Sequence, residues 1–75
     1  MTLHNRIVID PDIMVGKPVI AGTRIPVDLV LGKLAQNVDV DALLHDYPRL
    51  TRQDIQAALY YAQGLVNSED VYPTQ

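Results

Sequence analysis

Five polar residues near the middle of the C-terminal half have types and spacing that suit contact with DNA. Arg52, Gln53 and Gln56 fall on one face of a predicted helix, and Arg49 and Thr51 come directly before it. In the major groove, arginine recognises guanine and glutamine recognises adenine through paired hydrogen bonds. We therefore expect the three helix residues to contact bases and the two preceding residues to contact phosphate. The same residue types also suit an ordinary solvated helix face.

A catalytic or metal site finds little support. The histidines, His4 and His45, lie in different predicted elements, and only Asp41 stands at helical spacing from His45. The chain has no cysteine, and its one serine, Ser68, lies in the predicted tail. No glycine-rich phosphate loop is present, because the Gly16–Gly22 segment lacks the required ending. We expect no enzymatic activity, no metal and no cofactor.

Three amphipathic helices must position the polar residues. We expect them over residues 26–36, 39–46 and 52–63, with Pro26 opening the first. Their apolar stripes are Val27, Val30, Leu31, Leu34 and Ala35; Val40, Leu43, Leu44 and Tyr47; and Ile55, Ala58, Leu59 and Ala62. Tyrosines 60 and 61 could stack on bases, although half-buried packing is the more usual role.

The third helix has clear start and stop signals. Thr51 and Asp54 resemble a capping box with aspartate in place of glutamate, and Gly64 is a natural C-terminal cap. About four residues join the second and third helices, which is the layout of a helix-turn-helix. The sequence thus predicts a mainly α, three-helix core of the homeodomain or winged helix-turn-helix kind.

A short β-hairpin or strand pair is expected before this core. Its strands contain Ile7, Val8 and Ile9, and then Val19 and Ile20. An isolated hairpin is barely stable in water and its edges are open to pair with a second chain. We therefore expect these five residues to form a homodimer contact.

The loops around the second strand offer two basic residues. Two glycines and two prolines fix the backbone between Gly16 and Pro26. We expect this rigid segment to present Lys17 and Arg24 to a partner.

Size and charge limit the possibilities further. A chain of 75 residues without cysteine forms one small domain, which oligomerisation often supports. The net charge is −3, and residues 37–75 carry the acidic excess, whereas nucleic-acid binders are usually basic. No signal peptide and no apolar run of ~20 residues is visible, so we expect a cytoplasmic protein without membrane contact.

The chain resembles domain-of-unknown-function family 433 over about residues 5–63. The resemblance rests on motifs in the family's order, namely Ile7–Asp12, Gly16–Ile20, Gly22–Val27, Tyr47–Thr51, Asp54-Ile55 and Ala57–Leu59. The chain departs from the family at Ala21, where members often carry a basic residue, and retains Arg24.

The resemblance implies a VapB-like antitoxin that neutralises a PIN-like ribonuclease toxin and represses its own promoter. We therefore expect a dimerisation segment over residues 1–25, a helix-turn-helix core over 26–64 and a flexible tail over 65–75. The expected partners are a cognate toxin, operator DNA and a second copy of the chain. The alternative is a homodimeric adaptor that binds only protein.

Overall fold

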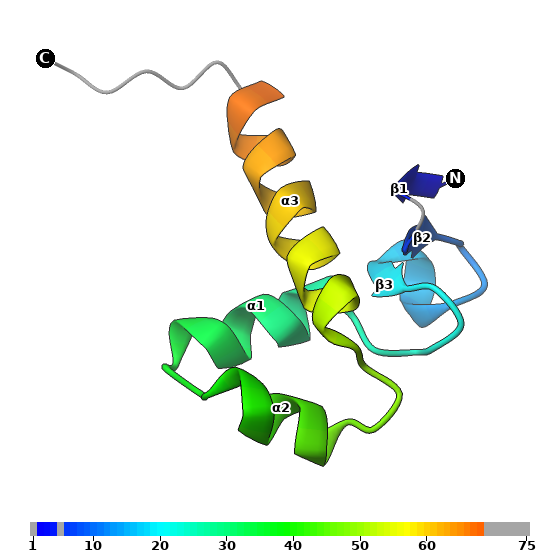
Figure 1. Ribbon diagram of the computed structural model, residues 1–75. Helices are drawn as coiled ribbons and strands as arrows, with labels where there is room; N and C mark the ends of the chain where they lie inside the picture. Colours follow the sequence, from blue (N-terminus) through cyan, green and yellow to red (C-terminus); the bar gives the residue numbers. More distant parts are fainter. Residues whose placement is uncertain (1, 5, 69–75) are drawn as a thin grey trace, which may run out of the picture.

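The computed structural model describes residues 2–4 and 6–68, in which a small antiparallel sheet lies beside three α-helices (Figure 1). The strands are β1 (Thr2–His4), β2 (Ile7–Ile9) and β3 (Pro18–Ile20), with a 3-10 helix, Met14–Gly16, between β2 and β3. The helices are α1 (Val27–Ala35), α2 (Val40–Asp46) and α3 (Arg52–Ser68). The predicted order, strands followed by three helices, is confirmed.

The sheet has β2 as its middle strand. Ile7 faces Ile20 and Ile9 faces Pro18 across the β2–β3 pair, so the predicted pairing of these two segments is confirmed. β1 adds a third strand on the other side of β2, which the sequence pattern did not predict. The side chains of Ile7, Val19 and Ile20 are fully buried, because this small sheet packs against the helices.

Most of the predicted helical stripes form the core. The buried cluster joins the sheet to all three helices through Ile7, Ile20, Val27, Val30, Leu43, Leu50, Ile55, Ala57 and Ala58. Val40, Leu44 and Tyr47 of the second stripe pack against this cluster. Two predicted core positions are wrong, because Ala35 and Leu59 are exposed.

The error at Leu59 has a physical cause in α3. Asp54 is buried, and Ala57 is buried as well, so the inward face of α3 lies closer to these two residues than the apolar stripe indicated. A pattern search does not count an aspartate as a core position. Leu59 consequently lies to one side of the buried face.

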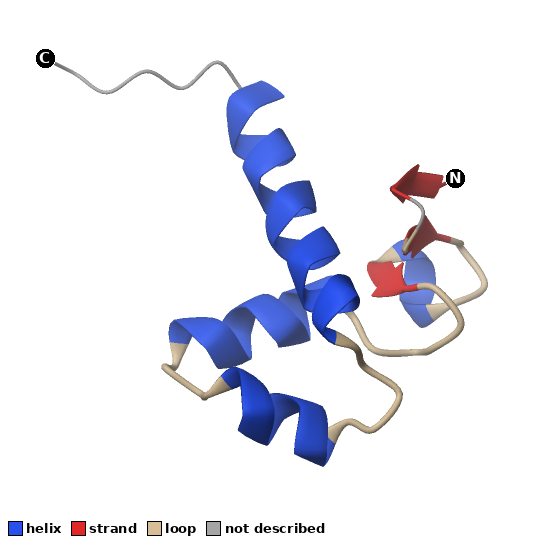
Figure 2. Cartoon of the chain, viewed as in Figure 1, coloured by secondary structure: helices blue, strands red, loops and turns tan. Residues whose placement is uncertain are grey.

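Residues 47–51 join α2 to α3, and the two helices form the predicted helix-turn-helix (Figure 2). The predicted capping box at the start of α3 is confirmed by two reciprocal bonds. The Asp54 amide donates to Thr51 Oγ1 over 3.1 Å, and the Thr51 amide donates to Asp54 Oδ2 over 3.0 Å. Together they satisfy two amides that the helix itself leaves unpaired.

The predicted end of the third helix is wrong. α3 continues through Gly64 to Ser68, so residues 65–68 belong to the helix and not to the predicted tail. Gly64 has no positive φ and therefore does not act as a left-handed cap. The remainder of the predicted tail, residues 69–75, lies outside the described residues.

Gly64→Ala should raise the free energy of unfolding by about 0.5–1 kcal/mol, because alanine suits a helix interior better than glycine. A Cβ at this position would meet no atom within 4 Å. Gly22→Ala is the matched control, since Gly22 has φ +76°, and it should lower stability by on the order of 1 kcal/mol. Urea unfolding of both variants measures the effect. Destabilisation by Gly64→Ala would place the helix end at Gly64 after all.

Candidate nucleic-acid interface

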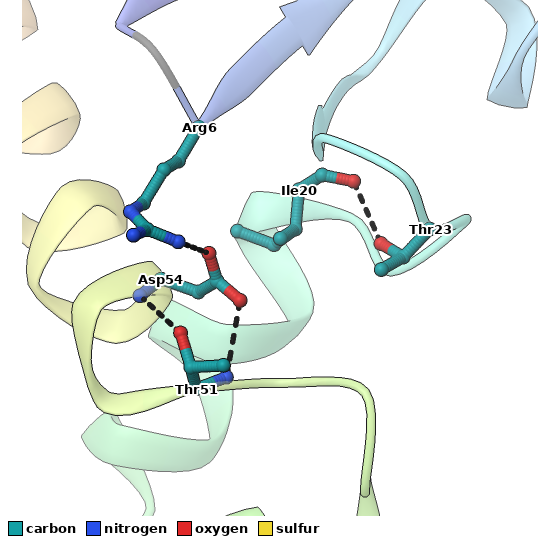
Figure 3. Close-up of polar contacts among 5 residues, drawn as sticks. All are labelled: Arg6, Ile20, Thr23, Thr51 and Asp54. Atoms are coloured by element: carbon teal, nitrogen blue, oxygen red, sulfur yellow. Dashed lines mark hydrogen bonds and ion pairs between the residues drawn. The ribbon is translucent and has the colours of Figure 1, made fainter.

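The start of α3 is fixed to the sheet by a buried carboxylate (Figure 3). Asp54 is 6% exposed, and its Oδ1 accepts a hydrogen bond from Arg6 Nη1 over 3.1 Å. Its second oxygen accepts from Thr51, as described above. Charge-assisted hydrogen bonds of this kind are stronger than neutral ones. Arg6 and Asp54 therefore set the position of the first turn of α3 relative to β2.

A tight turn before α1 holds the other side of the site. Gly22 adopts φ +76°, which glycine tolerates and other residues avoid. Thr23 Oγ1 donates to the Ile20 carbonyl over 2.7 Å and accepts from the Ile25 amide over 3.0 Å. The Gly22 carbonyl in turn accepts a hydrogen bond of 2.8 Å from Arg49 Nη2. This bond ties the loop between α2 and α3 to the turn.

Arg24 and Arg49 come together on one groove as a result. The groove has a volume of about 580 Å³ and is lined by both arginines, by Ile13 and by the turn from Gly22 to Ile25. The sequence predicts contact of Arg24 with a protein partner and of Arg49 with phosphate. Their proximity creates a local positive region on a chain that is acidic overall.

The predicted base-reading residues are accessible. Arg52, Gln53 and Gln56 are all exposed on the first turns of α3. Gln53 and Gln56 line a second groove, of about 550 Å³, together with Arg6, Ala57, Leu59, Tyr60 and Gln63. Glutamine amides donate and accept hydrogen bonds, so this face can pair with base edges.

Thr51 has two roles at the helix start. Its hydroxyl oxygen accepts the capping bond from Asp54, which leaves the hydroxyl proton to donate elsewhere. Thr51 is exposed, so a phosphate can reach this proton.

The acidic residues near this face are partly neutralised by neighbours. Arg52 Nη2 donates to Asp41 Oδ1, and Asp54 is paired with Arg6. Asp39 caps α2 by accepting a hydrogen bond of 3.2 Å from the Asp41 amide. The Arg52–Asp41 pair is exposed on both sides, and such pairs are easily opened. Arg52 can therefore exchange this carboxylate for a nucleic-acid contact.

Three of the predicted dimer residues, Ile7, Val19 and Ile20, have side chains buried in the core of the chain itself. Their contact with a second copy stays a prediction. Val8 and Ile9 are partly buried. Lys17 forms an exposed ion pair of 3.1 Å with Asp28 of α1.

Several exposed apolar residues are not predicted by the sequence pattern. Tyr60 is 65% exposed, which differs from the half-buried packing expected of it, while Tyr61 does pack against the core. Met14 and Val15 lie exposed in a strained segment, since both have positive φ. Tyr60 is exposed because the buried face of α3 lies at Asp54, Ala57 and Ala58, and the positive φ values of Met14 and Val15 belong to the 3-10 helix between β2 and β3.

Among the residues that the structure describes, no three His, Asp or Glu side chains are grouped as metal ligands. No helix within that same part of the chain is long and apolar enough to span a membrane.

The fold and this face define a helix-turn-helix domain preceded by a small antiparallel sheet. Residues 7–62 match the family described as "Protein of unknown function (DUF433)", and the chain belongs to this family.

A crystal structure of a DUF433 member protein from Anabaena variabilis has a TM-score of 0.78 and 35% identity to this chain. The match covers 91% of this chain and 67% of the Anabaena chain.

Two curated relatives are similar in sequence. Uncharacterized protein y4eO of Sinorhizobium fredii is 39% identical over 54 residues, which are 72% of this chain and 24% of that protein. An uncharacterized protein of Archaeoglobus fulgidus is 74% identical over 23 residues, which are 31% of this chain and 64% of that protein. The chain thus spans about a quarter of the Sinorhizobium relative and less than two thirds of the Archaeoglobus one.

Proposed function

We propose that this chain is a cytoplasmic antitoxin that binds a PIN-like ribonuclease toxin and represses its own promoter through the helix-turn-helix. The observation that supports DNA binding is the exposure of Arg52, Gln53 and Gln56 on the first turns of α3. In a helix-turn-helix, these turns of the second helix enter the major groove. The antitoxin role rests on the family resemblance. The proposal assigns no catalytic activity to the chain.

Phosphate contacts in this proposal come from the turn before α1 and from the loop that joins α2 to α3. Arg49 is held by the Gly22 carbonyl with Arg24 on the same groove, and Thr51 retains a free hydroxyl proton. Phosphate contacts fix the register of a protein on DNA, and base contacts select the sequence. With a net charge of −3, we expect the chain to bind DNA weakly by itself and more tightly with a basic toxin.

Co-expression tests the antitoxin role. The chain should co-purify with the nuclease encoded beside it and should relieve the nuclease's toxicity. As a control, Gly64→Ala, which preserves the fold, should behave as the parent does. An intact, folded chain that neither co-purifies with the nuclease nor relieves its toxicity would contradict the antitoxin role.

A second candidate is an adaptor that binds protein only. It is favoured by the exposed apolar residues Leu59, Tyr60 and Val66 of α3, and by Asp39 and Asp41 at the start of α2. In a helix-turn-helix complex, carboxylates at that position would lie close to phosphate and oppose binding. If the chain is such an adaptor, any affinity for DNA should be the same for all DNA sequences and should not change when residues of α3 are substituted.

A further inference from the structure

The C-terminal half of α3 extends beyond the rest of the molecule (Figure 1). Its side chains are unusually apolar for an exposed helix, since Leu59 is 50% exposed, Tyr60 65% and Val66 60%. Leu59, Gln63 and Val66 follow the i, i+4, i+7 spacing and share one face, and Tyr60 lies at the margin of that face. We call these four residues the α3 surface.

The absence of charge distinguishes the α3 surface from the rest of the chain. From Ile55 to Ser68 the sequence contains no Asp, Glu, Lys, Arg or His. Elsewhere, residues 37–75 are strongly acidic, so two copies that met at most other places would repel one another. Two copies of an uncharged apolar face can pack together without electrostatic repulsion. A strongly charged partner would instead require oppositely charged residues on the α3 surface.

We infer that the α3 surface binds the α3 surface of a second copy, with the two helices antiparallel. A two-fold axis near Ala62 and Gln63 places Leu59 of each copy against Val66 of the other. Ala62 is small and allows the helices to approach closely. This inference places the dimer contact on α3, whereas the sequence pattern predicts a contact through the strands. Leu59, Tyr60 and Gln63 also line the groove that contains Gln53 and Gln56, so the dimer contact lies next to the proposed base-reading residues.

The antiparallel arrangement is sterically reasonable because only the projecting half-helices overlap. α1 and α2 lie near the start of α3, and the sheet lies beside its first half and middle, where Arg6 lines a groove with Leu59, Tyr60 and Gln63 (Figure 1). The α1 and α2 helices of the two copies therefore sit at opposite ends of the helix pair. With 1.5 Å of rise per residue, the two copies of Arg52 are roughly 30 Å apart along the pair. This distance is close to the ~34 Å between successive major grooves on one side of DNA.

The contact is small, so we expect weak association. Two or three helical turns bury less than the roughly 800 Å² per partner of a standard interface. A dissociation constant on the order of micromolar fits an interface of this size. Dimerisation should therefore depend on concentration in the range accessible to sedimentation.

Paired charge substitutions at exposed positions test both the surface and its orientation. Leu59→Lys with Val66→Lys places like charges opposite one another and should convert the dimer to a monomer, raising the dissociation constant at least tenfold. Leu59→Lys with Val66→Glu places opposite charges against one another in the antiparallel pair and should restore the dimer. Sedimentation velocity measures association, and circular dichroism checks that both variants keep their helices.

Any other result of the sedimentation experiment overturns the inference. A parent that is monomeric throughout the concentration series has no such dimer. If the lysine pair remains dimeric, the contact lies elsewhere, for example at the sheet edge. If the lysine–glutamate pair is as monomeric as the lysine pair, the helices are not antiparallel. If the parent is monomeric and the lysine pair abolishes toxin binding, the surface belongs to the toxin.

A distance measurement gives a second readout. Because the chain has no cysteine, Gln53→Cys provides one attachment site for a spin label. We expect a distance between labels of roughly 30 Å in the dimer, whereas parallel helices would bring them within about half that distance. A chain that dimerises but does not bind operator DNA would refute the proposed function and leave this inference intact. A chain that binds the operator as a monomer would refute this inference and leave the proposed function intact.

Discussion

Asp54→Ala should lower the free energy of unfolding by about 2–4 kcal/mol, a large share of the roughly 4–11 kcal/mol typical of a domain this size. The carboxylate is 6% exposed and accepts hydrogen bonds from the Thr51 amide and from Arg6. Its removal leaves the Thr51 amide without this acceptor and takes a charged partner from Arg6, while Thr51 Oγ1 still caps the amide of residue 54. Urea unfolding monitored by circular dichroism measures the loss.

Three matched variants separate the contributions at this site. Thr51→Ala removes one bond of the capping box and should cost about 1 kcal/mol. Asp54→Asn keeps an acceptor for the Thr51 amide but loses the charge, so it should fall between Thr51→Ala and Asp54→Ala. Arg6→Ala should cost less than Asp54→Ala, because the Arg6 side chain is 44% exposed and solvent screens its charge. An Asp54→Ala variant as stable as the parent would show that this network does not hold α3.

Arg52→Ala should weaken operator binding about 5- to 150-fold and relax the base preference, which corresponds to a loss of about 1–3 kcal/mol. Asp41→Asn should have the opposite effect. It releases Arg52 from the ion pair and removes a negative charge near phosphate, so it should tighten binding several-fold. Fluorescence anisotropy with labelled operator DNA measures both variants.

Asp46→Asn is the control for net charge. It makes the same charge change as Asp41→Asn but lies at the far end of α2, where its carboxylate faces His45. A general charge effect would tighten binding equally in both variants. Equal affinities of parent and Arg52→Ala would remove Arg52 from the DNA-contacting residues.

Local sequence patterns predicted much of the fold. The spacing of Val40, Leu43 and Leu44 identified the inward face of α2, and Thr51 with Asp54 identified the start of α3. These features depend on residues within one or two helical turns, which a sequence pattern records directly.

Contacts between distant segments were beyond the reach of such patterns. Arg6 and Asp54 are 48 positions apart, and Arg49 and Gly22 are 27 apart, so no local spacing indicates either pair. The end of α3 was misjudged because glycine occurs both in helix caps and, less often, inside helices. Gly64 is inside one, and the helix continues beyond the body of the domain.

Anisotropy of the pure protein on its own upstream DNA, against a scrambled sequence and over a salt series, tests the central claim most directly. The account predicts at least about tenfold tighter binding to the upstream sequence. With Arg24 and Arg49 on phosphates, the logarithm of the affinity should fall with the logarithm of salt at a slope of roughly −2 per protomer. Equal affinity for both sequences at low salt would contradict DNA recognition by α3 and leave protein binding as the function of this chain.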